Sequence, residues 1–381
     1  MIKRKSIYFS MFILSIILTV FVSLKDLLQH KTVNYGLLER QFIIDGIICS
    51  IIFLLLFLFH KISLCNETKI LQPKTCLFEV TLFLILILSL SIPSGLIFDS
   101  GQNELDKWSI GIYSANSSEP FTFSGNNIQN PVLTSIDVTD VPAKFVADPF
   151  LIHQNNKYFL FFEVMNGKTN QGDIGLATSK DGYNWSYNQI VLDEPFHLSY
   201  PYVFKWRNDY YMIPESGAVK EVRLYKANNF PYNWSFVKTL IKGSDFVDNS
   251  IFYYNNTWWL YTSVNSSSDL LLYYSDNLLG PWVEHPKSPI VHGDMNISRS
   301  GGNVVVLNDT VVRYAQDDHP YYGNQVWALE VTKISKESYE EKKVSDIPAV
   351  KGYDNWNTRG MHQISPVKYN GSTWIASVDG Y

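Results

Sequence analysis

Cysteine is scarce in this 381-residue chain: there are three, at positions 49, 65 and 76, and none follows residue 76. No Cys-x-x-Cys pair or Cys/His spacing typical of structural zinc occurs. Charged residues are also few, 18% of the chain, and the net charge is −5 without a basic run. These features exclude a disulfide-rich secreted scaffold and argue against nucleic acid as a partner.

Charges are almost absent from three apolar runs in the first 100 residues. The runs cover residues 6–24, 42–59 and 80–98. Each is close to the ~20 residues that a helix needs to cross a bilayer. Asp45 is the exception, and we expect it at a helix end. No small-x-small cleavage site follows the first run, which favours an uncleaved anchor. Residues 1–100 are therefore predicted to form a membrane region of three spans.

The basic residues near these runs predict their orientation. Six Lys and Arg residues precede the first run or lie between the second and third, whereas three lie between the first and second. The positive-inside rule then places Met1 inside. Because three spans separate Met1 from the rest, we predict a multi-pass membrane protein. Its residues 107–381 would lie on the extracytoplasmic or lumenal side.

Residues 145–380 repeat one pattern about every 50 residues. Each repeat has a short apolar strand, a turn of Asn, Gly or Asp, an aromatic strand, a third strand, and an edge that contains Trp. Three of these edges read TyrAsnTrpSerTyr (183–187), TyrAsnTrpSerPhe (232–236) and GlyProTrpVal (280–283). Four antiparallel strands at this period are typical of a β-propeller blade. A β-sandwich, the alternative, does not repeat such edges at this spacing.

The last repeat is two strands short. It begins at residues 361–367 and continues at 372–378, after which the sequence ends. Two spare segments precede the first repeat: residues 108–114 resemble a third strand, and residues 131–137 could supply the fourth. We therefore predict an all-β, five-bladed propeller over residues 107–381. Strands from both ends would close its last blade and leave no open sheet edge.

Propeller geometry predicts a polar mouth. The start of each innermost strand and the end of the second strand open on the same face. Those positions hold Asp148 with Glu163, Tyr200 with Glu215, Asp248 with Thr262, Arg299 with Gln316 and Asp317, and His362 with Asp379. Clustered carboxylates suit glycoside chemistry, in which one acts as base or nucleophile and another as acid. Alternatively, these acids cap turns and strand ends.

Several segments resemble known families. AspPro (148–149), TyrPheLeuPhePheGlu (158–163) and SerLysAspGlyTyrAsnTrp (179–185) resemble the five-bladed arabinanase/levansucrase superfamily, which includes the family 43 glycoside hydrolases. A closer resemblance covers residues 107–381. It is to the propeller found at the N-terminus of plant glucosamine inositolphosphorylceramide transferases, and it rests on SerTyrProTyrValPhe (199–204), TyrMetIleProGluSer (211–216) and SerArgSerGlyGlyAsn (298–303). In those plant proteins a glycosyltransferase domain follows. This sequence ends at Tyr381, so we expect no sugar transfer by it.

The hydrolase resemblance implies catalytic roles for three residues. Asp148 matches the general base, Glu215 is the best-placed general acid, and Asp248 matches the Asp that tunes the pKa of the acid. Glu163 competes with Glu215 for its role. His362 resembles a channel histidine that lies near a bound metal in several family 43 enzymes, and no other cofactor is expected.

The remaining mouth residues are predicted to bind substrate: Glu163, Tyr200, Arg299, Asp317 and His362. Arg299 has no hydrolase counterpart. A bidentate Arg suits a carboxylate or phosphate on a ligand, and it equally suits a salt bridge between blades.

Three functions remain open at this point. The mouth could be a glycoside hydrolase-like site that acts on a glycan or glycolipid. It could instead hold a glycan for a partner glycosyltransferase in the membrane. The propeller could also be a protein-docking platform. The distance between the carboxylates would distinguish the first two, because hydrolases need about 5–5.5 Å or about 6.5–9.5 Å.

Overall fold

The computed structural model describes residues 107–381 apart from residues 118, 127 and 308. The chain divides into two units, Met1–Gly101 and Gln102–Tyr381, and only the second is described below. The predicted spans at 6–24, 42–59 and 80–98 lie outside the described residues. Within the described part, no helix has the length and apolarity needed to span a bilayer. The spans and their orientation stay predictions.

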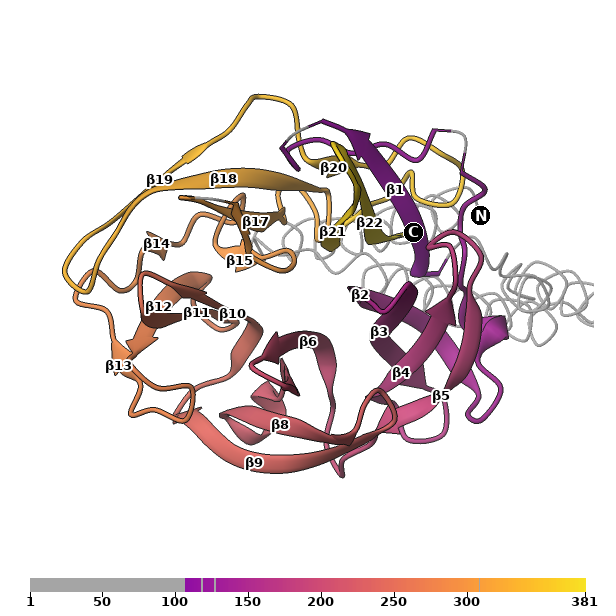
Figure 1. Ribbon diagram of the computed structural model, residues 1–381, viewed down its shortest axis with the longest axis horizontal. Coiled ribbons are helices and arrows are strands. Elements are labelled where there is room, and N and C mark those ends of the chain that lie inside the picture. The colour runs from indigo at the N-terminus through magenta and orange to yellow at the C-terminus, as the bar shows by residue number, and fades with distance from the viewer. Residues whose placement is uncertain (1–106, 118, 127, 308) are drawn as a thin grey trace, which may run out of the picture. The chain divides into compact units, whose positions relative to one another are not determined.

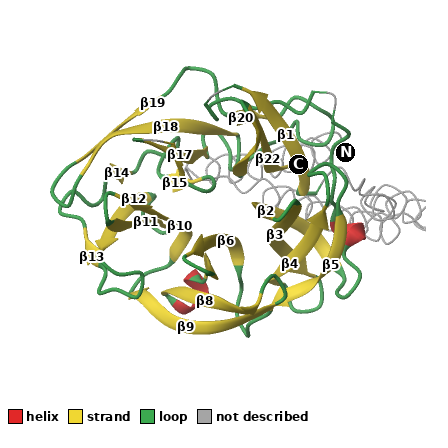
Figure 2. Ribbon diagram, viewed as in Figure 1, coloured by secondary structure: helices red, strands yellow, loops and turns green. Residues whose placement is uncertain are grey.

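The described residues form five antiparallel sheets arranged radially as propeller blades (Figure 1). Figure 2 shows that strands and loops make up almost all of this unit. Blade one contains β2 (Ala143–Gln154), β3 (Lys157–Asn166), β4 (Gln171–Ser179) and β5 (Ser186–Leu192). Blade two contains β6 (Ser199–Trp206), β7 (Asp209–Glu215), β8 (Glu221–Asn229) and β9 (Asn233–Lys242). The predicted five-bladed, all-β fold is confirmed.

Blades three and four have divided edge strands. Blade three contains β10 (Phe246–Tyr254), β11 (Thr257–Val264) and β12 (Asp269–Ser275), with β13 (Val283–Glu284) and β14 (Val291–His292) both paired to β12. In blade four, β15 (Arg299–Ser300) and β16 (Val305–Leu307) pair with β17 (Thr310–Asp317). Its outer strands are β18 (Gln325–Ile334), β19 (Tyr339–Lys343) and β20 (Val350–Lys351).

Blade five is built from both ends of the described chain. It contains β21 (Ile364–Asn370), β22 (Thr373–Gly380) and β1 (Ser109–Asn116). β1 runs antiparallel to β22, with Ser109 opposite Gly380 and Asn116 opposite Thr373. Figure 1 shows this indigo strand beside the yellow one. The predicted closure of the ring by residues 108–114 is confirmed.

The fourth strand predicted at residues 131–137 is wrong. Leu133 makes a single bridge to Ile110, and Ser135–Asp137 forms a short 3-10 helix, η3. Pro131 has no amide hydrogen to donate to a strand ladder. The Asp137 carboxylate accepts a hydrogen bond from the Thr134 amide at 2.8 Å, which holds the turn. Blade five therefore has three strands, and β1 makes two isolated bridges, to Leu133 and to Ser124. A second 3-10 turn, η4 (Gly217–Val219), follows β7.

Hydrophobic clusters join neighbouring blades. In the described part, buried apolar side chains form five clusters, one at each interface between blades. Phe161 of blade one, for example, lies in one cluster with Met212 of blade two, and both are fully buried. Burying one such side chain stabilises a fold by roughly 1.5–3 kcal/mol. These contacts hold the inner strands around the ring in fixed positions.

The repeated tryptophans close the turns that precede the outer edges. The indole N–H groups of Trp185, Trp234 and Trp282 each donate to a backbone carbonyl three or four residues earlier. The acceptors are Gly182 at 3.1 Å, Pro231 at 2.9 Å and Leu278 at 3.2 Å. An indole that packs against the fold usually finds such a partner for its N–H group. This contact gives a physical reason for the Trp in the sequence repeat.

Candidate functional site

Each of the first three inner strands has a bulge at the same place. Asp148, Tyr200 and Asp248 have φ angles of 52°, 44° and 54°, and the strand register shifts at each of them. Non-glycine residues seldom adopt positive φ, and a bulge redirects the side chains around it. Backbone strain of this kind clusters at functional sites. Here the bulge determines the direction in which the side chains at the start of each inner strand point.

The bulges border a pocket of about 250 Å³. Six of the residues predicted from the sequence line it: Asp148, Glu163, Glu215, Asp248, Arg299 and His362. They come from all five blades, so only the closed ring brings them together. The pocket wall also contains Trp108, His197 and Tyr322.

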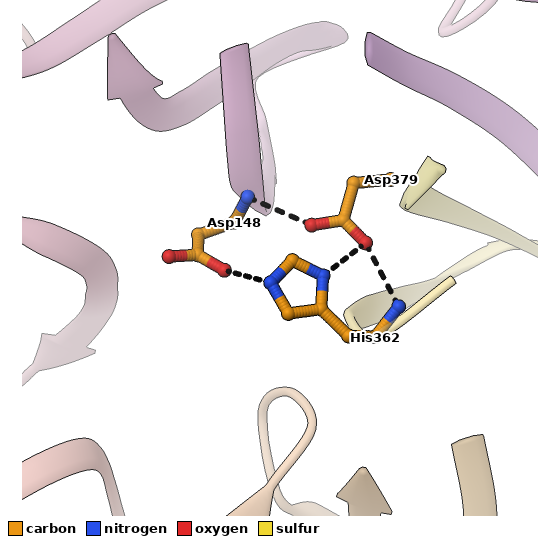
Figure 3. Close-up of side chains that lie close together, drawn as sticks. All are labelled: Asp148, His362 and Asp379. Carbon is orange, nitrogen blue, oxygen red and sulfur yellow. Dashed lines mark hydrogen bonds and ion pairs between the residues drawn. The ribbon is translucent and has the colours of Figure 1, made fainter. Parts of the chain in front are cut away.

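His362 lies between two carboxylates, as Figure 3 shows. Its Nδ1 atom is 2.8 Å from Asp379 Oδ1, and its Nε2 atom is 3.3 Å from Asp148 Oδ1. Burial by itself would lower the pKa of His362, but the charges of Asp379 and Asp148 outweigh it and raise the pKa to about 9. Burial raises the pKa of Asp148 to about 7, although His362 opposes the shift. At neutral pH His362 is therefore an imidazolium.

The same three residues are the part of the described site that could hold a metal ion. Asp148, His362 and Asp379 are close enough to hold an ion, because their ligand atoms lie within 4.8 Å of one another. However, a metal needs a neutral imidazole with a free lone pair. The Nδ1 atom of His362 bonds Asp379 and its Nε2 atom faces Asp148, so an ion at Nε2 would have to displace the proton that this nitrogen carries in the free protein. The three residues therefore form a proton-bridged cluster, and we derive no step through a metal.

Arg299 bridges blades three and four. Its Nε and one terminal nitrogen both lie 2.7 Å from Asp248 Oδ2. Its other terminal nitrogen is 3.9 Å from Asp318, and the guanidinium lies 5.3 Å from the centroid of the Tyr322 ring. Of the two roles open to Arg299 in the sequence, the structure shows the salt bridge. The pair also fixes Asp248 at the pocket wall.

Glu163 and Glu215 form the third part of the wall. Burial, followed by the charge of Asp248, raises the pKa of Glu215 to about 8. Burial, followed by the charge of Asp148, raises the pKa of Glu163 well above its usual range. The Glu215 carboxyl group is therefore mainly protonated at neutral pH in the free protein, and burial shifts the pKa of Glu163 in the same direction. In that form each can donate one hydrogen bond and accept others.

Tyr200 and Asp317 do not line the pocket. The Tyr200 side chain is fully buried, and its hydroxyl accepts a hydrogen bond from the Gly302 amide at 2.7 Å. Asp317 accepts hydrogen bonds from the side chains of Gln325 and Trp327, at 2.8 and 2.9 Å. Both side chains hold neighbouring strands together. Their positions argue against the substrate contacts predicted for them.

The sequence reasoning missed an aromatic part of the wall. The Trp108 ring lies 4.2 Å from the His362 ring, centre to centre. The Tyr322 ring lies 5.3 Å from the same His362 ring. Trp108 directly precedes β1, so the predicted ring closure could have placed it at the mouth. Tyr322 follows β17 in a turn, where no periodic signal marked it. Asp318, beside the predicted Asp317, is a second acid near Arg299, at 3.9 Å.

Together the fold and the pocket define a five-bladed β-propeller with acidic and aromatic residues at one mouth. A solved glycosyl hydrolase from Bacteroides ovatus is similar in structure, with a TM-score of 0.50. The two are 12% identical, and the similarity covers 68% of this chain and 93% of that one. At this identity the likeness shows the fold alone.

Sequence comparison gives the family. The model of the glucosamine inositolphosphorylceramide transferase 1 N-terminal family matches residues 101–381, and the chain belongs to this family. Glucosamine inositolphosphorylceramide transferase 1 of Oryza sativa subsp. japonica is 38% identical over 296 residues, which are 72% of this chain and 40% of that protein. The protein of the same name from Arabidopsis thaliana is 34% identical over 298 residues, 72% of this chain and 39% of that one. This chain thus spans about two-fifths of these relatives, and the predicted resemblance is confirmed.

Proposed function

We propose that the pocket binds a sugar residue of a glycan or glycolipid. The observation that carries this proposal is the composition of its wall, in which the half-buried Trp108 lines the same pocket as the buried carboxyl groups of Glu163 and Asp148. Aromatic faces pack against the apolar side of a sugar ring, and carboxyl groups bond its hydroxyls.

The names of the relatives support a glycolipid. They describe a transferase of glucosamine and inositolphosphorylceramide, and we propose a lipid of that chemical class as the source of the sugar. Residues 1–100 would anchor the propeller in a membrane, with the pocket on the extracytoplasmic or lumenal side. There the propeller would present the glycan to a partner glycosyltransferase.

Titration calorimetry of the full chain with methyl glycosides tests this function. Trp108→Ala removes the aromatic face and should weaken sugar binding roughly tenfold, which corresponds to about 1.4 kcal/mol. Phe236→Ala is the matched control, because this aromatic is 48% exposed on the outer strand β9. Equal loss in both variants, or no binding of any glycoside by the wild type, would refute the proposal.

Glycoside hydrolysis is the second candidate. It is favoured because Asp148 and Glu215 line one pocket, and the pKa of the proposed acid, about 8, exceeds that of the proposed base, about 7. Glu215 would protonate the leaving oxygen while Asp148 activates water, with Asp248 tuning the acid. Asp148→Asn should then abolish release of sugar from an aryl glycoside. If binding and any activity survive Asp148→Asn unchanged, the docking platform becomes the better account.

A further inference from the structure

His197 lines the mouth pocket beside Glu163, although it was not among the residues predicted from the sequence. It lies in the connection between β5 and β6. Two hydrogen bonds hold this connection to Gly172, near the start of β4. The Leu198 amide donates to the Gly172 carbonyl, and the Gly172 amide donates to His197 Nδ1, both at 2.9 Å. Backbone atoms therefore hold the imidazole of His197 in place.

The bond from Gly172 determines which tautomer His197 adopts. Nδ1 accepts a hydrogen bond, so it carries no proton. A neutral imidazole then carries its proton on Nε2. Burial lowers the pKa of His197, which keeps the ring neutral at neutral pH. His197 Nε2 is therefore a fixed hydrogen-bond donor at the pocket wall.

Glycine at position 172 permits this arrangement. A Cβ atom there would lie 2.2 Å from the Leu198 carbonyl oxygen. It would also lie 2.9 Å from both Glu163 Oε1 and His197 Cε1. Any larger residue would have to move the connection or displace both side chains, so the close approach requires glycine. Position 172 thus allows His197 and Glu163 to lie side by side.

His197 and Glu163 lie close together without bonding each other. Nε2 and Oε1 are 3.7 Å apart, beyond the range of a hydrogen bond. Glu163 is 6% exposed, and no group in the described part of the chain donates a hydrogen bond to its carboxyl group. In either protonation state this group keeps an acceptor oxygen. The pocket therefore offers a donor and an acceptor that one bridging oxygen atom can satisfy.

We propose that His197 is a specificity-determining residue, which together with Glu163 binds one hydroxyl group of the sugar. The hydroxyl oxygen accepts a hydrogen bond from His197 Nε2, and its O–H donates one to Glu163 Oε1. A hydroxyl suits this position because it both donates and accepts. An ether oxygen only accepts, and a ring position without a hydroxyl leaves both protein groups unpaired inside the pocket. The inference rests on the proposed sugar-binding function and adds the residue that selects for a hydroxyl group at one ring position.

A cycle of protein and ligand changes tests this role. Calorimetry of the full chain would compare a methyl glycoside that binds with its monodeoxy derivatives, each of which lacks one hydroxyl group. In the wild type, one derivative should bind about tenfold or more weakly than the parent, because it leaves a donor and an acceptor unpaired. His197→Asn should remove that difference. An Asn oxygen takes the place of Nδ1 and still accepts the Gly172 amide, but no donor remains at the place of Nε2.

Two further variants are matched to His197→Asn. His197→Gln places an amide N–H group near the place of Nε2, so it should retain a preference of at least about threefold for the parent glycoside. His153→Asn is the control, because His153 is exposed near the end of β2 and does not line the pocket. It should leave every affinity unchanged.

The outcomes separate this inference from the function on which it rests. If His197→Asn weakens the parent and every derivative by the same factor, His197 has a structural role and the inference is wrong. It is also wrong, while sugar binding stands, if the preference for that hydroxyl survives His197→Asn or if the wild type shows no such preference. If the wild type binds no glycoside, both are wrong.

Melting curves identify any variant that does not fold. If His197→Asn is one of these, proton NMR of the wild type decides the matter. The resonance of the His197 Nε2 proton should shift when the parent glycoside binds and stay unchanged with the derivative that lacks the recognised hydroxyl. Equal shifts with both ligands would overturn the inference.

Discussion

Asp379 is the residue on which the mouth most depends, and Asp379→Asn gives the sharpest test of its geometry. The side chain is fully buried near the end of β22. Its Oδ1 atom accepts hydrogen bonds from the amides of His362 and Gln363, at 3.1 and 3.0 Å, and from His362 Nδ1 at 2.8 Å. Its Oδ2 atom accepts the Asp148 amide at 2.9 Å. One carboxylate thus ties blade five to blade one.

The substitution removes one acceptor and the negative charge. An Asn amide group in place of Oδ2 would face the Asp148 N–H, and a buried unsatisfied donor costs about 1–3 kcal/mol. The His362 imidazolium would also lose its closest partner, and breaking a buried ion pair costs about 3–5 kcal/mol. These terms overlap, so we expect a loss of about 4 kcal/mol in the free energy of unfolding at pH 6.

The loss should depend on pH in one direction. The folded-state pKa of His362 is raised from 6.5 to about 9. Its contribution to stability is therefore fully present below pH 6.5 and is lost as the pH rises through about 9. The difference between wild type and Asp379→Asn should shrink over that window. Above it, only the lost backbone hydrogen bond of about 1–2 kcal/mol should remain.

Urea unfolding followed by tryptophan fluorescence measures this difference. All 10 tryptophans lie between Trp108 and Trp374, so the signal reports on the propeller alone. Asp209→Asn is the control, because Asp209 forms an exposed ion pair with Lys226 at 2.9 Å that should contribute less than about 1 kcal/mol. An effect of Asp379→Asn below 1 kcal/mol, or one that does not vary between pH 6 and pH 9.5, would refute the reasoning.

Three further predictions test the ring and its surroundings. Deleting residues 107–117 removes β1 and exposes the edge of β22, so size-exclusion chromatography should show aggregates, and a stable monomer would contradict the closure. Arg313→Met leaves Glu341 without the guanidinium that now bonds it at 2.9 Å. The free energy of unfolding should fall by about 3–5 kcal/mol, and Arg313→Met combined with Glu341→Leu should recover most of that loss. An unchanged free energy of unfolding in Arg313→Met would show that the pair is dispensable. Tags at Met1 and Tyr381 should be cleaved by protease from opposite sides of intact vesicles, and cleavage from one side would reject the three predicted spans.

The sequence predicted the ring and much of its mouth because both follow from periodicity. The repeated Trp edges set the blade count, and the strand starts and ends set which positions share a face. Asp148 and Glu215 reach one pocket for that reason, although they come from different blades. The contact between β1 and β22 could also be predicted from the sequence, because the last repeat lacks strands that β1 can supply.

The predictions for Tyr200 and Asp317 differ from the structure because the direction of one side chain decides whether it lines the pocket. Tyr200 occupies the same bulge as Asp148, but its longer side chain crosses to the Gly302 backbone instead of lining the pocket. β17 ends at Asp317, which bonds the neighbouring strand, whereas Asp318 follows the strand and lies near Arg299. A bulge or a turn changes the direction of the side chains that follow it, and residue type and spacing do not predict that change.

A crystal structure of the full chain with a methyl glycoside that binds in calorimetry tests the account most directly. The account predicts the sugar ring in the pocket that Trp108 lines, with a hydroxyl group within 3.2 Å of a carboxyl oxygen of Glu163 or Asp148, the usual limit for such a hydrogen bond. A sugar bound elsewhere on the propeller, or an empty pocket at a concentration that calorimetry shows to be saturating, would contradict it.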